Sequence, residues 1–182
     1  CSKITLLQLH GYCAAAAYFM IATRCDLVYV TPEARIGALE ARFLGPAGAV
    51  SAVHINRILG TRAARRHGYT GTAMSGEDAL RHGLAHACVS PDALEGAVLE
   101  RARELASLPA AMARYLKTRI RSAESLFETN VREVSGLLFS HFLQAAPDEA
   151  HFWSQVKTGG VGAALDADKA RLAAATGGAP RS

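Results

Sequence analysis

The first 30 residues have the pattern of a strand, a helix and a second strand, and this pattern constrains the fold more than any other feature of the chain. Residues 4–10 (ITLLQLH) form a short apolar, β-branched run closed by Gly11. Residues 14–24 are helix formers throughout, and residues 27–30 (LVYV) form a second apolar run. Continuous apolar strands are typical of a parallel sheet buried on both faces. The sequence therefore predicts a βαβ unit and an α/β fold.

Strand and helix patterns continue to alternate until about residue 90. The expected elements are a third short strand at 34–37, a helix at 47–59, a short helix at 61–67, a helix at 77–82 and a strand at 84–89. Gly60 is expected to end the first of these helices and Gly83 the last. Ser75 and Asp78 have the spacing of a capping box, which marks the start of the helix that follows.

The chain changes character beyond residue 91. The remaining expected elements are helices at 92–107, 109–120, 122–146 and 148–156. The apolar residues between 126 and 142 exceed what one exposed helix keeps, so this region is expected to pack on another surface, such as a second subunit. An Ala/Gly-rich stretch at the end is expected to be a flexible tail. We therefore divide the chain into a core (1–91), a helical region (92–158) and a tail (159–182).

Length and composition agree with a folded protein. Half of the 182 residues are hydrophobic, which is enough to bury a core in one domain with an appended helical piece. No run approaches the roughly 18 apolar residues of a membrane span, and the first residues lack the layout of a signal peptide. We expect a cytoplasmic protein that is not bound to a membrane.

Charge and cysteine content disfavour two further classes of site. The net charge is +4, but basic and acidic residues are interleaved along most of the chain. The densest basic cluster, around Arg62 and Arg65, is followed by a gap too long for a helix-turn-helix, so nucleic acid is not an expected partner. The four cysteines have neither zinc-site nor disulfide spacing. We expect free thiols and no metal.

Five segments resemble, in the same order, the enoyl-CoA hydratase/isomerase group of the crotonase superfamily. They are KITLLQLHGYC, CDLVYV, TPEARIGALEARFLGPAG, ILGTRAARR and YTGTAMSGEDALRHGLAHACVS. The resemblance covers residues 3 to about 145. One such segment would be a weak signal, whereas five in register are specific.

The resemblance implies a fold and a substrate class. The fold is a crotonase-type spiral of ββα units, of which this chain carries the C-terminal portion, followed by an α-helical oligomerisation region that builds trimers or hexamers. In full members about ninety or more residues precede the HGY turn, so a longer natural chain or a partner is expected to supply those strands. The implied ligand is an acyl-CoA thioester, and no cofactor is implied other than the coenzyme A of the substrate.

The shared chemistry of the family places a backbone N–H group at the start of the helix after the HGY turn. Counted from the turn the position is Ala16, and counted back from Asp26 it is Ala17. An N–H in the first turn of a helix has no partner within the helix and lies at the positive end of its dipole. It can therefore stabilise the oxyanion of a thioester enolate without any side chain. Close packing of small residues is the alternative explanation for the alanines.

The resemblance also assigns one of two catalytic carboxylates. The second glutamate of the family falls on Glu40, whereas the first falls on Phe19 or Met20, which transfer no proton. One carboxylate beside an enolate can move a proton between carbons, as in an enoyl-CoA isomerase. Isomerisation is the preferred reaction, with hydration and carbon–carbon cleavage as neighbours. The alternative is a non-catalytic crotonase-like binding or interaction protein, in which Glu40 is an ordinary loop carboxylate.

Further residues are assigned to the acyl-CoA pocket. They are Tyr12, Cys13, Phe19, Met20, Phe43, Gly45 and His54. His54 could equally be a core histidine, and Asp26 is expected to be a structural hydrogen-bond acceptor. By charge alone, Arg57, Arg62 and Lys117 could meet the phosphates of coenzyme A.

Overall fold

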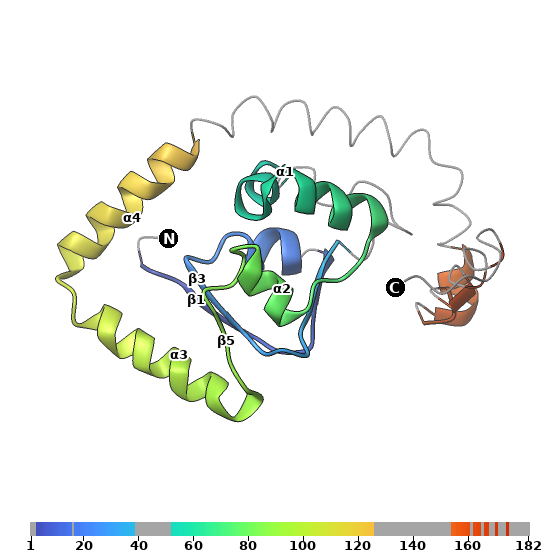
Figure 1. Cartoon of the computed structure of the whole chain (residues 1–182), viewed down its shortest axis with the longest axis horizontal. Helices are drawn as coiled ribbons and strands as arrows, with labels where there is room; N and C mark the ends of the chain where they lie inside the picture. Colours follow the sequence, from blue (N-terminus) through green and yellow to red (C-terminus); the bar gives the residue numbers. More distant parts are fainter. Residues whose placement is uncertain are drawn as a thin grey trace.

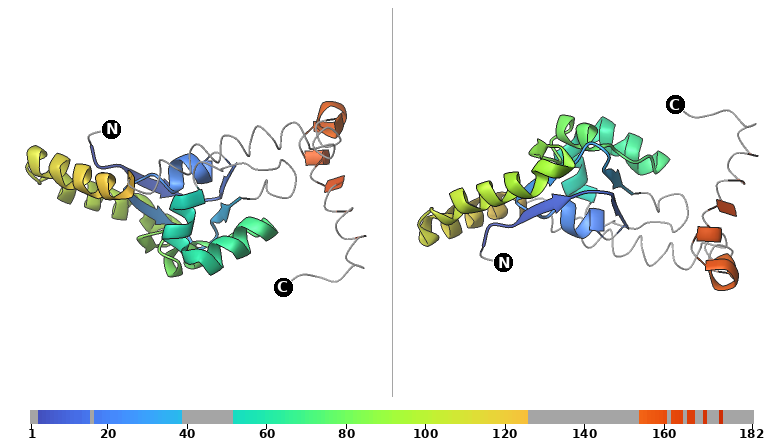
Figure 2. Two further views of the ribbon diagram at one scale, coloured as in Figure 1. Left: turned by 90° about the horizontal axis from the view of Figure 1, so that it is seen from above. Right: turned by 90° about the horizontal axis from the view of Figure 1, so that it is seen from below.

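The computed structural model describes residues 3–15, 17–38, 52–125, 154–160, 162–164, 166, 167, 170 and 174. Its centre is a parallel three-stranded sheet in the order β1 (Leu6–Leu9), β3 (Leu27–Val30) and β5 (Ala87–Cys88). A π-helix, η1 (Ala17–Ala22), lies on one side of the strands, and the helices α1 and α2 described below lie on the other (Figure 1, Figure 2). The fold is therefore α/β, as the sequence predicts.

The opening βαβ unit forms where it was expected. β1 and β3 pair in parallel from Leu6 opposite Leu27 to Leu9 opposite Val30. Val30, in the central strand, is completely buried, because the sheet is covered on both faces. The helix between the strands begins later than its residue types suggest, and it closes i→i−5 hydrogen bonds, such as the one from the N–H of Thr23 to the carbonyl of Tyr18 at 3.3 Å.

The late start of that helix has a tertiary cause. Residues 12–14, which precede it, form a strand β2 (Tyr12–Ala14) that pairs in parallel with β4 (Arg35–Gly37). An isolated β-bridge then joins Ile36 to Met74. The extended pairing overrides the helix propensity of Ala14, so the expectation of a helix from residue 14 is wrong. The third short strand expected at 34–37 is confirmed as β4.

The two helices after the second sheet follow the local signals of the sequence. The helix α1 (Ala52–Thr70) is interrupted at Gly60, which has φ 73°, so it consists of two segments as predicted. The helix α2 (Gly76–Arg81) begins with a capping box, in which the N–H of Asp78 donates to Ser75 Oγ at 3.1 Å. Gly83, with φ 78°, follows its end. Residues 39–51 lie outside the described part, so the start of the helix expected at 47 is untested.

Gly76 permits the closest approach between α2 and the sheet. A Cβ atom at this position would lie 2.0 Å from the carbonyl oxygen of Thr31, a backbone atom that cannot rotate away. We therefore expect Gly76→Ala to destabilise the fold by about 1–3 kcal/mol, although alanine is the better helix former. Gly96→Ala is the matched control, because a Cβ there meets nothing within 4 Å, and it should be neutral or stabilising. Urea unfolding of both variants measures the difference, and equal midpoints would contradict the prediction.

A histidine side chain continues the hydrogen-bond ladder where β5 begins. The N–H of Val28 donates to His86 Nδ1 at 3.0 Å, and the N–H of His86 donates to the carbonyl of Val28 at 2.8 Å. The strand β5 is shorter than the strand expected at 84–89, because the N–H groups of Leu84 and Ala85 donate to the carbonyl of Ala79 in α2. His86 Nδ1 can accept the bond from Val28 only while it carries no proton.

The sheet should accordingly lose stability in mild acid. Burial lowers the pKa of His86 below its ordinary value of 6.5, so the unfolded chain binds a proton at a higher pH than the folded chain does. The contribution is fully present above pH 6.5 and is lost as the pH falls below it. Because the ring is partly exposed, the slope should stay well under the ~1.4 kcal/mol per pH unit of a buried group. Urea midpoints measured from pH 8 to pH 5 should fall more for the wild type than for His86→Asn, and parallel curves would refute the assignment.

Two helices joined by a short turn lie beside the sheet. They are α3 (Pro91–Ala106) and α4 (Ala110–Ser125). Figure 1 shows α3 running along the strands and α4 turning back toward the start of the chain. The helix α4 continues without a break through residue 121, contrary to the expected division there. Residues 126–153, and most of the helix expected at 122–146, lie outside the described part.

The remaining described residues are few. Residues 154–160 are helical, and so are residues 162–164, 166, 167, 170 and 174 within the expected tail. The three-part division of the chain stays a prediction. In the part of the chain that the structure describes, no helix has the length and apolar character needed to span a membrane.

Candidate active site

The backbone turns sharply from strand to helix at Ala15. This residue has φ 51°, a left-handed conformation that costs a residue with a Cβ roughly 1–2 kcal/mol. Such strained positions cluster at functional sites. The turn follows β1 and β2 at the carboxyl ends of the parallel strands, which is the edge where α/β sheets bind ligands. The next described residue, Ala17, opens η1.

The pairing of β2 with β4 places the starts of the two predicted catalytic segments side by side. Ala14 and Gly37 are direct partners in the register of the two strands. The chain continues three residues from Ala14 to Ala17, and three residues from Gly37 to Glu40. Both segments therefore start from paired positions. Three residues span at most about 10 Å, so neither segment extends further than this from its start. Glu40 and Ala16 themselves lie outside the described residues.

The start of η1 is where the sequence predicts a backbone donor for an oxyanion. The first N–H groups of a helix have no partner within it and carry its positive partial charge. Ala17 is partly buried and packs against the core. Two neighbours on η1, Tyr18 and Ala22, are each only 2% exposed, so the helix is anchored on the sheet along one side. A donor on this helix is therefore held in a defined direction.

The residues assigned to the acyl-CoA pocket fall into different surroundings. Tyr12 is 80% exposed, whereas Cys13 beside it is buried, and Cys13 pairs with Ile36 of β4. His54 is buried in the first segment of α1 and has an interaction partner, as a core histidine does. Phe19 and Met20 are part of η1, and Phe43 and Gly45 lie outside the described residues. The pocket assignments stay predictions.

The described cysteines are free thiols, as expected. Burial, followed by the charge of Cys25, raises the pKa of Cys13 to about 11. The pKa of Cys25 and the pKa of Cys88 are also raised, in both cases mainly by burial. These thiols carry a proton at neutral pH, so none has the thiolate character of a nucleophile.

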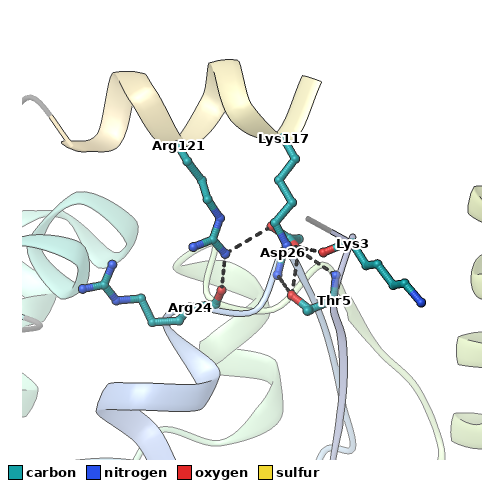
Figure 3. A network of polar contacts seen from close by, with 6 residues as sticks. All are labelled: Lys3, Thr5, Arg24, Asp26, Lys117 and Arg121. Atoms are coloured by element: carbon teal, nitrogen blue, oxygen red, sulfur yellow. Dashed lines mark hydrogen bonds and ion pairs between the residues drawn. The ribbon is translucent and has the colours of Figure 1, made fainter. Parts of the chain in front are cut away.

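The opposite end of η1 is tied to a network of polar contacts around Asp26 (Figure 3). Asp26 Oδ2 accepts hydrogen bonds at 2.6 Å from the N–H of Thr5, from Thr5 Oγ1 and from Lys117 Nζ. Lys117 Nζ also donates to the carbonyl of Lys3. The expectation that Asp26 is a structural acceptor is confirmed.

Lys117 corrects an expectation drawn from charge alone. Its side chain is only 5% exposed and its ammonium group is used by Asp26 and by the carbonyl of Lys3, so it does not meet a ligand phosphate. Burial alone would raise the pKa of Asp26, but hydrogen bonds from Lys117 and Thr5 outweigh it, and the pKa lies below its ordinary value. No local pattern in the sequence pairs two residues that lie 91 positions apart.

Comparison with known proteins gives a consistent result. The family model described as enoyl-CoA hydratase/isomerase matches residues 1–151. The (E)-benzylidenesuccinyl-CoA hydratase of Thauera aromatica is 28% identical over 141 residues, which are 78% of this chain and 53% of that protein. The chain thus spans about half the length of this curated relative.

Solved structures agree with the family match. An enoyl-CoA hydratase from Mycobacterium smegmatis superposes with a TM-score of 0.82 at 25% identity, over 94% of this chain and 58% of that chain. An enoyl-CoA hydratase/isomerase from Xanthobacter autotrophicus Py2 has the same fold, with a TM-score of 0.84 at 23% identity, over 94% of this chain and 63% of that chain. The order of strands, the turn into η1 and the match over most of the sequence lead to one conclusion: the chain belongs to the enoyl-CoA hydratase/isomerase family, within the crotonase superfamily.

Proposed function

We propose that the protein acts on an acyl-CoA thioester through an enolate, which backbone N–H groups stabilise while Glu40 moves a proton. The observation that carries this proposal is the pairing of Ala14 with Gly37, because it starts the segments of both groups from one point at the carboxyl edge of the strands. Membership of the enoyl-CoA hydratase/isomerase family supports the substrate class.

The first group is the N–H of Ala16 or Ala17. Negative charge develops on the thioester oxygen when a proton leaves the neighbouring carbon. A donor that is already oriented at the start of η1 stabilises this charge without reorganising. The strained turn at Ala15 supports this role, because it directs the chain into the helix at this point.

The second group is the carboxylate of Glu40. It takes a proton from one carbon of the acyl group and returns it to another, which moves the double bond. Because Phe19 and Met20 stand where a second carboxylate would be needed, addition of water is disfavoured. Hydration stays an alternative reaction, because several relatives are named hydratases. Carbon–carbon cleavage is the other alternative.

A non-catalytic binding protein of the same fold is the second candidate. It is favoured by the exposed apolar residues of α4, of which Met112, Leu116 and Ile120 follow one another at helical spacing. Such a face is typical of helices that pack against another chain. A trimer or hexamer, the expected assembly, would cover it.

One experiment separates the two candidates. The full-length protein is incubated with short enoyl-CoAs in deuterated water, and deuterium uptake and double-bond migration are followed by mass spectrometry and NMR. We expect deuterium at the carbon next to the thioester and a shifted double bond. Binding of acyl-CoA without either change would favour the non-catalytic candidate.

A further inference from the structure

The helix η1 connects the carboxyl end of one strand to the amino end of the next. The helix starts after the turn that follows the carboxyl end of β1, and it ends just before the amino end of β3 at Leu27. A six-residue helix closes few hydrogen bonds of its own, so its direction depends on the packing of Tyr18 and Ala22 and on what holds its ends. One end leads to the proposed oxyanion donor, and the other leads into the polar network of Figure 3.

Two side chains of α4 hold the far end. Lys117 binds Asp26 at 2.6 Å. One helical turn further on, Arg121 Nη2 donates to the carbonyl of Arg24 at 3.1 Å and lies 3.6 Å from Asp26 Oδ1. The carbonyl of Arg24 belongs to the turn that ends η1. The helix α4 therefore contacts the backbone just beyond η1 as well as the carboxylate.

The same network fixes the strands on either side. The N–H groups of Asp26 and Leu27 both donate to the carbonyl of Thr5 at 3.1 Å, and the N–H of Asp26 also donates to Thr5 Oγ1 at 3.1 Å. Since β1, β3 and the end of η1 meet here, loss of the contacts from α4 would free the end of η1 while the strand ladder remains. Among the α4 contacts, that of Arg121 with the carbonyl of Arg24 is made with the turn after η1, whereas Lys117 contacts residues that flank β1 and β3.

We propose that Lys117 and Arg121 are positioning residues for the active site: by holding the turn at Arg24 and Asp26, they fix the direction of η1 and so aim the N–H at its other end. Neither side chain touches the substrate. The inference rests on the proposed function of that N–H. It also adds a role for the helical region, which so far was expected only to oligomerise.

The test compares four variants of the full-length protein. Arg121→Gln removes the contact with the carbonyl of Arg24 from a partly exposed side chain, and it is expected to fold. Lys117→Met leaves the carboxylate of Asp26 without its buried partner, and Lys117→Arg restores the charge as a rescue. Arg119→Gln is the matched control, because Arg119 is on the same helix but contacts only Tyr115 among the contacts found for its side chain in the described residues.

Two readouts are measured at a temperature where each variant is folded. Hydrogen exchange of the backbone amides of residues 17–25 reports the anchoring of η1, and kcat and KM for enoyl-CoA conversion report the site. We expect exchange to become several-fold faster in Arg121→Gln and Lys117→Met, with kcat reduced about tenfold and KM little changed, because small misplacements of a catalytic group act on kcat. Lys117→Arg should recover most of the loss, and Arg119→Gln should match the wild type.

The outcomes separate the two proposals. Unchanged exchange in Arg121→Gln, or faster exchange with unchanged kcat, would overturn the positioning role. If Lys117→Met does not fold, Arg121→Gln alone decides. A wild-type protein without activity on any thioester, together with faster exchange in the variants, would leave the anchoring of η1 standing and reject the proposed function.

Discussion

Replacing Glu40 with glutamine is expected to lower kcat for double-bond migration by about 10²–10⁴-fold, the usual contribution of a general acid–base group. Glutamine keeps the size and polarity of the side chain but cannot accept the proton that leaves the acyl chain. KM should change little, because glutamine fills the same space and the loss falls on the proton-transfer step. Steady-state kinetics and deuterium uptake from the solvent measure the effect directly.

The matched control for this variant is Glu33→Gln. Glu33 is an exposed carboxylate in the turn before β4, seven residues earlier in the same segment. A change of charge alone would affect both variants alike, whereas a proton-transfer role affects only Glu40→Gln. Equal activity of Glu40→Gln and the wild type would show that this chain does not use Glu40 in catalysis.

Removing the N–H of Ala17 is expected to lower kcat by about 10²–10³-fold, which corresponds to roughly 2.7–4 kcal/mol of transition-state stabilisation. Ala17→Pro deletes this donor, and proline is tolerated at the first position of a helix because no intrahelical bond is lost there. Ala17→Gly is the control, since it keeps the N–H and removes only the methyl group. The measurement is kcat for both variants, with their melting temperatures recorded alongside.

The kcat of Ala17→Pro decides whether Ala16 or Ala17 supplies the donor. If Ala17→Pro folds and retains kcat, the donor is assigned to Ala16, and Ala16→Pro becomes the variant to measure. If neither proline reduces kcat in a folded protein, backbone stabilisation of an enolate at this turn is wrong. The family membership of the chain would remain, and the non-catalytic candidate would gain support.

Local signals in the sequence predicted much of the fold. The capping box at Ser75, the stop at Gly83 and the break at Gly60 were found because each depends on a few neighbouring residues. The strands β1 and β3 were found because a buried parallel strand is a short continuous apolar run. The missed strand β2 has no such signal, since Ala14 favours a helix and only its pairing with Gly37 makes the segment extended.

Some features of the candidate site could also be predicted from the sequence, and others could not. The turn, the helix after it and the absence of a carboxylate at residues 19 and 20 could be read from the chain, and the family resemblance supplied the role of Glu40. The positions of the other pocket residues, such as Phe43 and Gly45, stay predictions because they lie outside the described residues. The burial of His54 could not be derived from the sequence, because a lone histidine on a helix has no local signal for its surroundings.

The sequence by itself determined the α/β class, the strand–helix–strand order of β1, η1 and β3, and the presence of a helix start without reactive side chains, because these depend on propensities and spacing along the chain. Tertiary structure alone decided that Ala14 meets Gly37 and that Lys117 of α4 binds Asp26 at the far end of η1. These contacts join residues far apart in the sequence. Such contacts form only when whole elements pack together, so no short stretch of the sequence predicts them.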